Sequence, residues 1–158
     1  MTAGPDQQVR WLSEDEMRAW RAFIVGSALL EYRLNRELQE EHGLTLADYE
    51  ILARLSDQPG MRMRMTQLAT DVASSKSRVS HQVGRLESAD LVRRESCPSD
   101  GRGILAILTE RGFQVLRSAA PTHLRGVREH LVDHLTGEQQ SVITAVFGGV
   151  AERLRAQP

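Results

Sequence analysis

Residues 66–108, TQLATDVASSKSRVSHQVGRLESADLVRRESCPSDGRGILAIL, carry the pattern that decides the fold. Residues 66–72 are predicted to form a short helix with a side-chain cap, and the serines within 74–77 are typical of the start of a second helix. In the second helix, apolar residues recur at the spacing of one helical face and are expected to pack inward. They are Val79, Val83 and Leu86. The opposite face is small, polar and cationic, and consists of Ser77, Arg78, His81, Gly84 and Arg85.

Two short helices joined by a tight turn, the second with hydrogen-bond donors on its outer face, match the helix-turn-helix pattern. Directly after them, residues 91–97 and 103–108 have β-type sequences, and the Asp-Gly pair within 98–102 indicates a hairpin. Just before them, the strict alternation of Met and Arg over 61–65 predicts one very short strand. The helix pair is therefore expected to carry a β-wing.

A long amphipathic helix and a shorter one are predicted before this lobe. Ser13 and Glu16 have the spacing of a capping box, and the helix they start is expected to end near residues 42–43. Its apolar stripe contains Met17, Trp20, Phe23, Ile24, Leu30, Leu34 and Leu38. Thr45 and Asp48 have the arrangement of a second helix start.

Two more helices are predicted after the lobe. The first begins at Thr109 and is expected to bend at Pro121 without ending there. The second is expected to begin with a capping box formed by Thr136 and Gln139. Its apolar stripe consists of Val142, Ile143, Val146, Val150 and Leu154. The first and last helices of the chain are too extended to bury their apolar faces alone, so we expect those faces to contact a partner subunit.

The composition limits the classes of protein to consider. The chain has 158 residues, of which 41% are hydrophobic and 26% charged, and this excludes disordered and collagen-like classes. A lone Cys97 excludes an intramolecular disulfide framework. No apolar run approaches the roughly 18 residues of a membrane helix, and the polar start MTAGPDQQ lacks the pattern of a signal peptide. We therefore expect a soluble, cytoplasmic protein without membrane contact.

Charge is distributed unevenly along the chain. Residues 62–102 contain eight Arg and Lys against five Asp and Glu, whereas residues 1–61 contain six Arg against eleven acidic residues. A basic middle between acidic or neutral ends suits a module that faces nucleic acid, because phosphate attraction needs positive charge only at the contact. Ordinary charge scatter is the alternative, and composition alone does not separate the two.

The order of these elements resembles the MarR family of bacterial transcription regulators over nearly the whole chain. Residues 77–87, SRVSHQVGRLE, are similar to the recognition helix of that family. Residues 91–94, LVRR, followed by Asp100-Gly101-Arg102, are similar to its strand and D-x-R wing. Asp90 departs from the family pattern, which has Gly there, but Asp tolerates the left-handed conformation.

The resemblance implies a mainly α (α+β) fold, in which a winged helix-turn-helix DNA-binding lobe lies between N- and C-terminal helical dimerisation arms. The chain is then a single MarR-type domain over 1–158, with its lobe at 45–108 and its arms at 1–44 and 109–158. The resemblance further implies an obligate homodimer that binds pseudo-palindromic operator DNA. We expect a repressor of nearby genes that a small phenolic or lipophilic effector releases from DNA.

The recognition helix contains most of the predicted DNA contacts. Contacts to phosphates or base edges are expected near its start, from Ser75, Lys76, Ser77 and Ser80. Base reading is expected from Arg78, His81, Gln82 and Arg85. In the wing, Arg102 is expected to enter a minor groove while Asp100 accepts its guanidinium. The alternatives are a solvated polar face for the helix, on which Gln82 lies nearer the inner stripe, and a surface salt bridge for the wing.

Other residues support weaker hypotheses. Tyr32, His42 and Tyr49 are candidate effector contacts. At most one of Arg93 and Arg94, on opposite faces of a strand, is expected to face phosphate. Cys97 lacks a neighbouring Lys or His in the sequence, which argues against a redox sensor. A metal site on the stripe formed by His123, His130 and His134 would resemble zinc-sensing members of the family, but solvated or interface histidines fit better, so we expect no metal and no cofactor.

Two rival functions are weighed against a DNA-binding regulator. An enzyme is not expected, because the sequence contains no G-x-S-x-G, no phosphate-binding glycine loop, no H-E-x-x-H and no C-x-x-C. A winged helix that has lost DNA binding and serves only as a protein-interaction dimer is the second rival. Arg78, Arg85 and the Asp100-Gly101-Arg102 segment argue against it.

Overall fold

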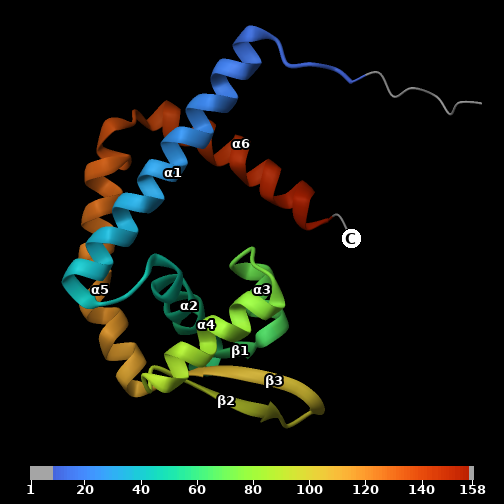
Figure 1. Cartoon of the computed structure of the whole chain (residues 1–158), viewed down its shortest axis with the longest axis vertical. Helices are drawn as coiled ribbons and strands as arrows, with labels where there is room; N and C mark the ends of the chain where they lie inside the picture. Colours follow the sequence, from blue (N-terminus) through green and yellow to red (C-terminus); the bar gives the residue numbers. More distant parts are fainter. Residues whose placement is uncertain (1–8, 157–158) are drawn as a thin grey trace, which may run out of the picture.

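The computed structural model describes residues 9–156, and the polar start that bears on a signal peptide lies outside this range. The described chain is mostly helical with one small antiparallel sheet (Figure 1). Its elements are α1 (Glu14–His42), α2 (Leu46–Ser56), a 3₁₀ turn (Pro59–Met61), β1 (Arg62–Arg64), α3 (Met65–Asp71), α4 (Lys76–Ser88), β2 (Val92–Cys97), β3 (Asp100–Leu108), α5 (Glu110–His130), a second 3₁₀ turn (Val132–His134) and α6 (Gly137–Arg155). This order confirms the predicted winged helix-turn-helix with helical arms.

The predicted helix starts are mostly correct. Capping boxes are present at Ser13, Thr45 and Thr136, and α5 continues through Pro121. The cap predicted for the helix at 66–72 is wrong, because α3 begins at Met65 and no side chain caps it. The chain enters α3 directly from β1, so the pairing of that strand with β3 fixes where the helix starts.

The sheet has the strand order β1-β3-β2, and all its pairs are antiparallel. The predicted position of the hairpin turn is wrong. Pro98 and Ser99 form the turn, while Asp100 and Gly101 already belong to β3. A register shift lies between Ser96 and Cys97, and Cys97 pairs with Asp100. Because of this irregularity the chain reverses before the Asp-Gly pair, and Asp100 lies at the start of β3 instead of in the turn.

The hydrophobic core lies inside the lobe, under the end of α1 and the first half of α5. Among its fully buried side chains are Leu38, Ile51, Leu52, Leu55, Leu68, Val79, Val83 and Val92. The predicted inner face of α4 is correct, since Val79, Val83 and Leu86 are all buried. After α4 the chain reverses at Asp90, whose φ of 59° is the left-handed conformation that Asp tolerates.

The two terminal helices differ from the lobe in burial. α6 has no buried residue, and the buried residues of α1 are Leu34 and Leu38, both near its C-terminal end. The rings of Phe23 and Phe147 stack at a centroid distance of 4.8 Å, where α1 and α6 meet. Large apolar side chains stay exposed on both helices, as predicted for faces that need a partner. No helix within 9–156 is both long and apolar enough to cross a membrane.

Candidate nucleic-acid interface

The second helix of the helix-turn-helix, α4, presents one polar side to solvent. The Ser75 hydroxyl accepts a hydrogen bond from the Arg78 amide at 3.2 Å, which fixes where the helix begins. Most of the residues predicted here are exposed, namely Ser75, Lys76, Ser77, Arg78, Ser80, His81 and Arg85, while Gln82 is half-buried. Because Val79 and Val83 anchor the opposite side in the core, this polar side is held outward.

The flank of α4 that faces the wing is shallow and lined by small side chains. A hollow there is lined by Ser77, Ser80, His81, Gly84, Arg85, Ser88 and Arg94. Small residues let another backbone come close, and hydroxyl, imidazole and guanidinium groups provide hydrogen-bond donors around the hollow. The geometry suits contact with an anionic, hydrogen-bonding surface.

The flank of α4 that faces α2 carries an ion pair that sequence reasoning missed. Arg85 donates to the Asp48 carboxylate at 2.9 Å, so its guanidinium has a partner within the chain. Asp48 also caps α2 by accepting from the Thr45 amide at 3.3 Å, and only 12% of its side chain is exposed. The capping pattern identifies Asp48 in the sequence, but nothing in the sequence indicates its second role across 37 residues.

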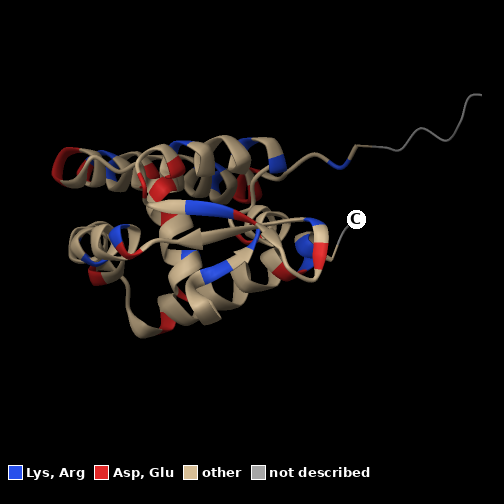
Figure 2. Cartoon of the chain, turned by 90° about the horizontal axis from the view of Figure 1, so that it is seen from below, with Lys and Arg blue, Asp and Glu red and all other residues tan. Residues whose placement is uncertain are grey.

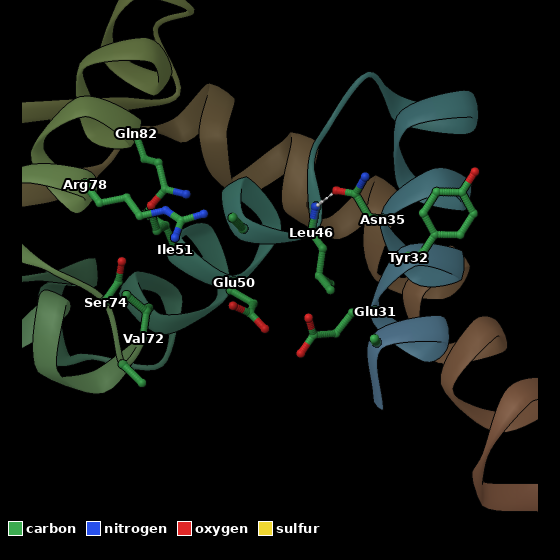
Figure 3. A pocket seen from close by; sticks show the side chains of 13 residues that line it. Glu31, Tyr32, Asn35, Leu46, Glu50, Ile51, Val72, Ser74, Arg78 and Gln82 are labelled. Atoms are coloured by element: carbon green, nitrogen blue, oxygen red, sulfur yellow. Dashed lines mark hydrogen bonds between the residues drawn. The ribbon is translucent and has the colours of Figure 1, made fainter. Parts of the chain in front are cut away.

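Arg78 and Gln82 share that flank and line a cavity of about 520 Å³ between α4, α2 and α1 (Figure 3). Glu31 of α1 and Glu50 of α2 extend into the same space. Burial raises the pKa of Glu50. The positive charge of Arg54 offsets part of this shift, and the negative charge of Glu31 adds to it. The cavity therefore touches both an arm and the second helix of the helix-turn-helix, and it contains a guanidinium at one end and carboxylates at the other.

The three candidate effector residues are not brought together. Tyr32 lines the cavity. His42 lies within 2.8 Å of the Thr122 hydroxyl, and the Tyr49 ring packs on His123 at a centroid distance of 4.4 Å. The His42 and Tyr49 side chains therefore fasten α1 and α2 to α5, and neither lines the cavity. Of the three, Tyr32 alone remains a candidate effector contact.

The wing contains a second ion pair that differs from the expected one. Asp100 does not hold the Arg102 guanidinium. Its carboxylate accepts one hydrogen bond from the Arg64 guanidinium at 3.3 Å and another from the Arg102 backbone amide at 3.2 Å. These contacts, that of the Arg102 amide first and that of Arg64 second, lower the pKa of Asp100. Arg64, in a strand of only three residues, carries no sequence feature that indicates this role.

Both arginines of β2 form ion pairs with glutamates of the same chain. Arg94 donates to the Glu87 carboxylate through its backbone amide, Nε and Nη2, and the Nη2 distance is 2.8 Å. The side-chain bond from Arg94 is the main reason that the pKa of Glu87 is lowered. Arg93 pairs with Glu95 on its own strand. The contact of Arg94 fastens the wing to α4, and Figure 2 shows cationic positions along these strands.

The residues considered for sensing do not form a metal site. Cys97 is buried, with its Sγ 3.4 Å from the Ser99 hydroxyl, and that hydroxyl, helped by Arg64, lowers the pKa of the thiol. His130 contacts Glu37 at 2.7 Å, and His134 contacts a backbone carbonyl. Within the described range, no three His, Cys, Asp or Glu residues gather as metal ligands.

Comparisons with known proteins agree on one family. The MarR family profile matches residues 44–104. AbsC, a MarR family transcriptional regulator from Streptomyces coelicolor, is 47% identical with a TM-score of 0.89, over 94% of this chain and 100% of that one. Sco3205, a MarR family regulator from the same organism solved in complex with DNA, is 44% identical with a TM-score of 0.90, over 97% and 94%. The HTH-type transcriptional repressor Mb2911 of Mycobacterium bovis is 32% identical over 82% of this chain and 89% of its own length.

Proposed function

The chain belongs to the MarR family of transcriptional regulators, and on that premise we propose that it is a homodimeric, sequence-specific DNA-binding repressor. Its relatives are transcriptional regulators and not enzymes. One of the two similar Streptomyces structures is a complex with DNA, and the mycobacterial relative is a repressor by name. Both facts support the same activity here.

One observation carries the proposal: the exposed polar side of α4 lies beside a wing that carries Arg93, Arg94 and Arg102, while the apolar side of α4 is buried. In this arrangement α4 enters a major groove and the wing reaches an adjacent minor groove. The proposed DNA contacts are Ser75, Lys76, Ser77, Arg78, Ser80, His81, Gln82, Arg85 and Arg102. Asp100 acts from within the wing, through its bonds to other residues.

The exposed apolar faces support the proposed homodimer. Val146 and Leu154 on α6, and Trp20 on α1, belong to the apolar stripes of their helices and are each at least half exposed in the single chain. Apolar patches of this kind mark protein interfaces. We assign residues 1–44 and 109–158 to the dimerisation arms and 45–108 to the DNA-binding lobe. Twofold symmetry then places two copies of α4 about one turn of DNA apart, roughly 34–36 Å, on a pseudo-palindromic site.

The cavity beside α4 supports the proposed release by a small effector. Tyr32 of α1 and Arg78 of α4 both line it, so an occupant touches an arm and a proposed DNA contact together. An effector that binds the DNA-free arrangement of Arg78 more tightly than the DNA-bound one shifts the population away from DNA. Coupling then requires only this unequal affinity.

Selection and titration test the DNA-binding proposal. The full-length protein is used to select duplexes from a random-sequence pool, and fluorescence anisotropy then compares a selected duplex with a scrambled one between about 50 and 200 mM salt. We expect a steep salt dependence and a large affinity ratio between the two duplexes. In the same assay, Arg102→Ala is expected to weaken binding about tenfold.

Two outcomes would contradict the proposal. Equal affinity for the selected and scrambled duplexes would remove sequence specificity. No binding to either duplex at the lowest salt would favour the rival in which the winged helix serves only as a protein-interaction dimer.

A further inference from the structure

Next to the turn of the wing, the Asp100 carboxylate lies between two arginines, Arg64 and Arg102. Asp100 lies at the start of β3, its Oδ2 is 3.3 Å from Arg64 Nη1, and its Oδ1 accepts the backbone amide of Arg102 at 3.2 Å. Arg64 belongs to β1, the central strand β3 carries Asp100 and Arg102, and the pairing of these two strands brings the three residues together. The Asp100 carboxylate is therefore shared between the helix-turn-helix side of the sheet and the wing.

Asp100 has a second arginine within reach. The Arg102 backbone amide donates to the Asp100 carboxylate at 3.2 Å, so the Arg102 side chain starts directly beside that carboxylate. An unpaired carboxylate in this position attracts a flexible guanidinium and forms a local ion pair. Within the described residues, no acidic group holds the Arg102 guanidinium, and Asp100 holds that of Arg64. The two arginines thus compete for one acidic partner, and Arg64 occupies it.

We propose that Arg64 is a positioning residue for DNA binding, because it occupies Asp100 and so leaves the Arg102 guanidinium free to enter the DNA groove. The inference rests on the proposed function and adds a mechanism to it. Arg64 also neutralises an acidic group that would otherwise repel nearby phosphates. Without Arg64, Asp100 would attract Arg102 back onto the wing and present a negative charge to DNA.

The backbone near this contact is shaped to admit the Arg64 side chain. A Cβ atom at Gly103 would lie 3.0 Å from Arg64 Nη1 and 3.1 Å from the Cys97 Cβ, closer than ordinary side-chain contacts. The absence of a side chain at Gly103 therefore leaves the space through which the Arg64 guanidinium reaches Asp100. Arg64 is 43% exposed and Asp100 48% exposed, so both remain near the surface that would meet DNA.

A second-site suppression experiment tests the proposal. Full-length wild type, Arg64→Gln, Asp100→Asn and the Arg64→Gln/Asp100→Asn double variant are titrated onto the selected duplex by fluorescence anisotropy. We expect Arg64→Gln to weaken binding about five- to tenfold, and the double variant to bind within about twofold of Asp100→Asn alone. Asn keeps an oxygen for the Arg102 amide but no longer attracts its guanidinium. Arg62→Gln, on the same strand, is the control for loss of one positive charge.

Each result is decisive for one hypothesis. If Arg64 contacts phosphate itself, Arg64→Gln weakens binding equally in both backgrounds, and the positioning role is wrong. The same conclusion holds if Arg62→Gln and Arg64→Gln weaken binding equally, or if Arg102→Ala weakens binding and Arg64→Gln does not. Unfolding midpoints from circular dichroism show whether a loss of affinity reflects misfolding. A misfolded Arg64→Gln variant would not regain affinity when Asp100→Asn is added. Absence of any preferred duplex for wild type overturns the proposed function itself, and this inference with it.

Discussion

The helix-turn-helix lobe and the terminal arms are built from amphipathic helices of the same kind, yet their apolar faces have opposite surroundings. In α4, Val79 and Val83 are fully buried against the rest of the lobe. In α6, Val142 is 56% and Leu154 62% exposed, and no residue of that helix is buried. The lobe thus completes its core within one chain, whereas the arms do not.

This difference shows what helical periodicity does and does not encode. A stripe at steps of three and four identifies the side of a helix that avoids water, but not which surface covers it. For α4 the covering surface comes from α2, α3 and the sheet. For α6 the described chain provides little cover beyond the contact of Phe147 with Phe23. Variants that disturb the two stripes should therefore fail in different ways.

The largest effect is expected from a charge placed on the apolar face of the arm. Val146→Glu puts a carboxylate where we propose a partner subunit, and burying an unpaired charge is strongly unfavourable. We expect a monomeric protein whose affinity for the selected duplex falls about 100-fold or more, because the two half-sites are no longer bound together. Analytical ultracentrifugation and anisotropy measure the two effects.

Ser141→Glu is the matched control, since Ser141 lies on the opposite side of α6 and is exposed. It adds the same charge to the same helix and should leave both the oligomeric state and the affinity near those of wild type. A monomeric Ser141→Glu would mean that helix stability, and not the apolar face, determines assembly. A Val146→Glu variant that remains dimeric would place the interface elsewhere.

Truncation in the lobe should instead reduce stability within the single chain. Leu52→Ala removes a fully buried side chain and is expected to cost about 2–5 kcal/mol of unfolding free energy. Leu154→Ala, at a site 62% exposed, should cost less than about 0.5 kcal/mol. Both are measured by urea denaturation in the Val146→Glu background, so that dimerisation does not contribute. Equal costs would mean that α6 packs within its own chain.

Most of the fold could be predicted because its determinants are local. The capping boxes at Ser13, Thr45 and Thr136 involve residues three apart, and the inward stripe of α4 spans two turns. The errors occur where a distant segment decides the local structure. The start of α3 follows from the pairing of β1 with β3, and the turn at 98–99 follows from an irregular register in the wing.

The candidate site was predicted less completely for the same reason. Residue type and spacing identified the exposed side of α4, but not the partners of its arginines. Arg85 meets Asp48 across 37 residues, and Asp100 meets Arg64 across 36. An arginine on a helix or strand has several acidic groups within reach, and only the packed lobe decides which one it meets.

A moderate effect is expected from Asp48, whose two contacts both lie inside the lobe. Asp48→Ala removes one of the two hydrogen bonds of the α2 capping box and the partner of Arg85, and should cost about 1–2 kcal/mol of unfolding free energy. Arg85→Ala removes only the ion pair, whose arginine is 55% exposed, so its cost should be smaller. Thermal or urea unfolding of both variants gives the comparison. Equal costs would show that the hydrogen bond from the Thr45 amide to Asp48 contributes nothing, and a shift in oligomeric state would contradict a role confined to the lobe.

The smallest effect concerns His123, at the junction where the arm helix α5 meets the lobe. Its ring packs on Tyr49 of α2 at 4.4 Å, its Nδ1 is buried without a hydrogen-bond partner, and burial lowers its pKa. The His123 imidazole is therefore protonated at a higher pH in the unfolded chain than in the folded chain. As the pH falls below about 6.5, protons favour the unfolded state and the free energy of unfolding decreases.

His123→Phe keeps an aromatic ring against Tyr49 but cannot be protonated. Between about pH 7.5 and 5.5, wild type should therefore lose more unfolding free energy than the variant does. The raised pKa of Glu50 acts in the opposite direction, but it is present in both proteins and cancels in the difference. Parallel pH profiles of the urea midpoint would contradict a neutral, buried imidazole. A steeper wild-type profile would show that His123 is neutral in the folded chain, held against Tyr49 where the arm helix α5 meets the lobe.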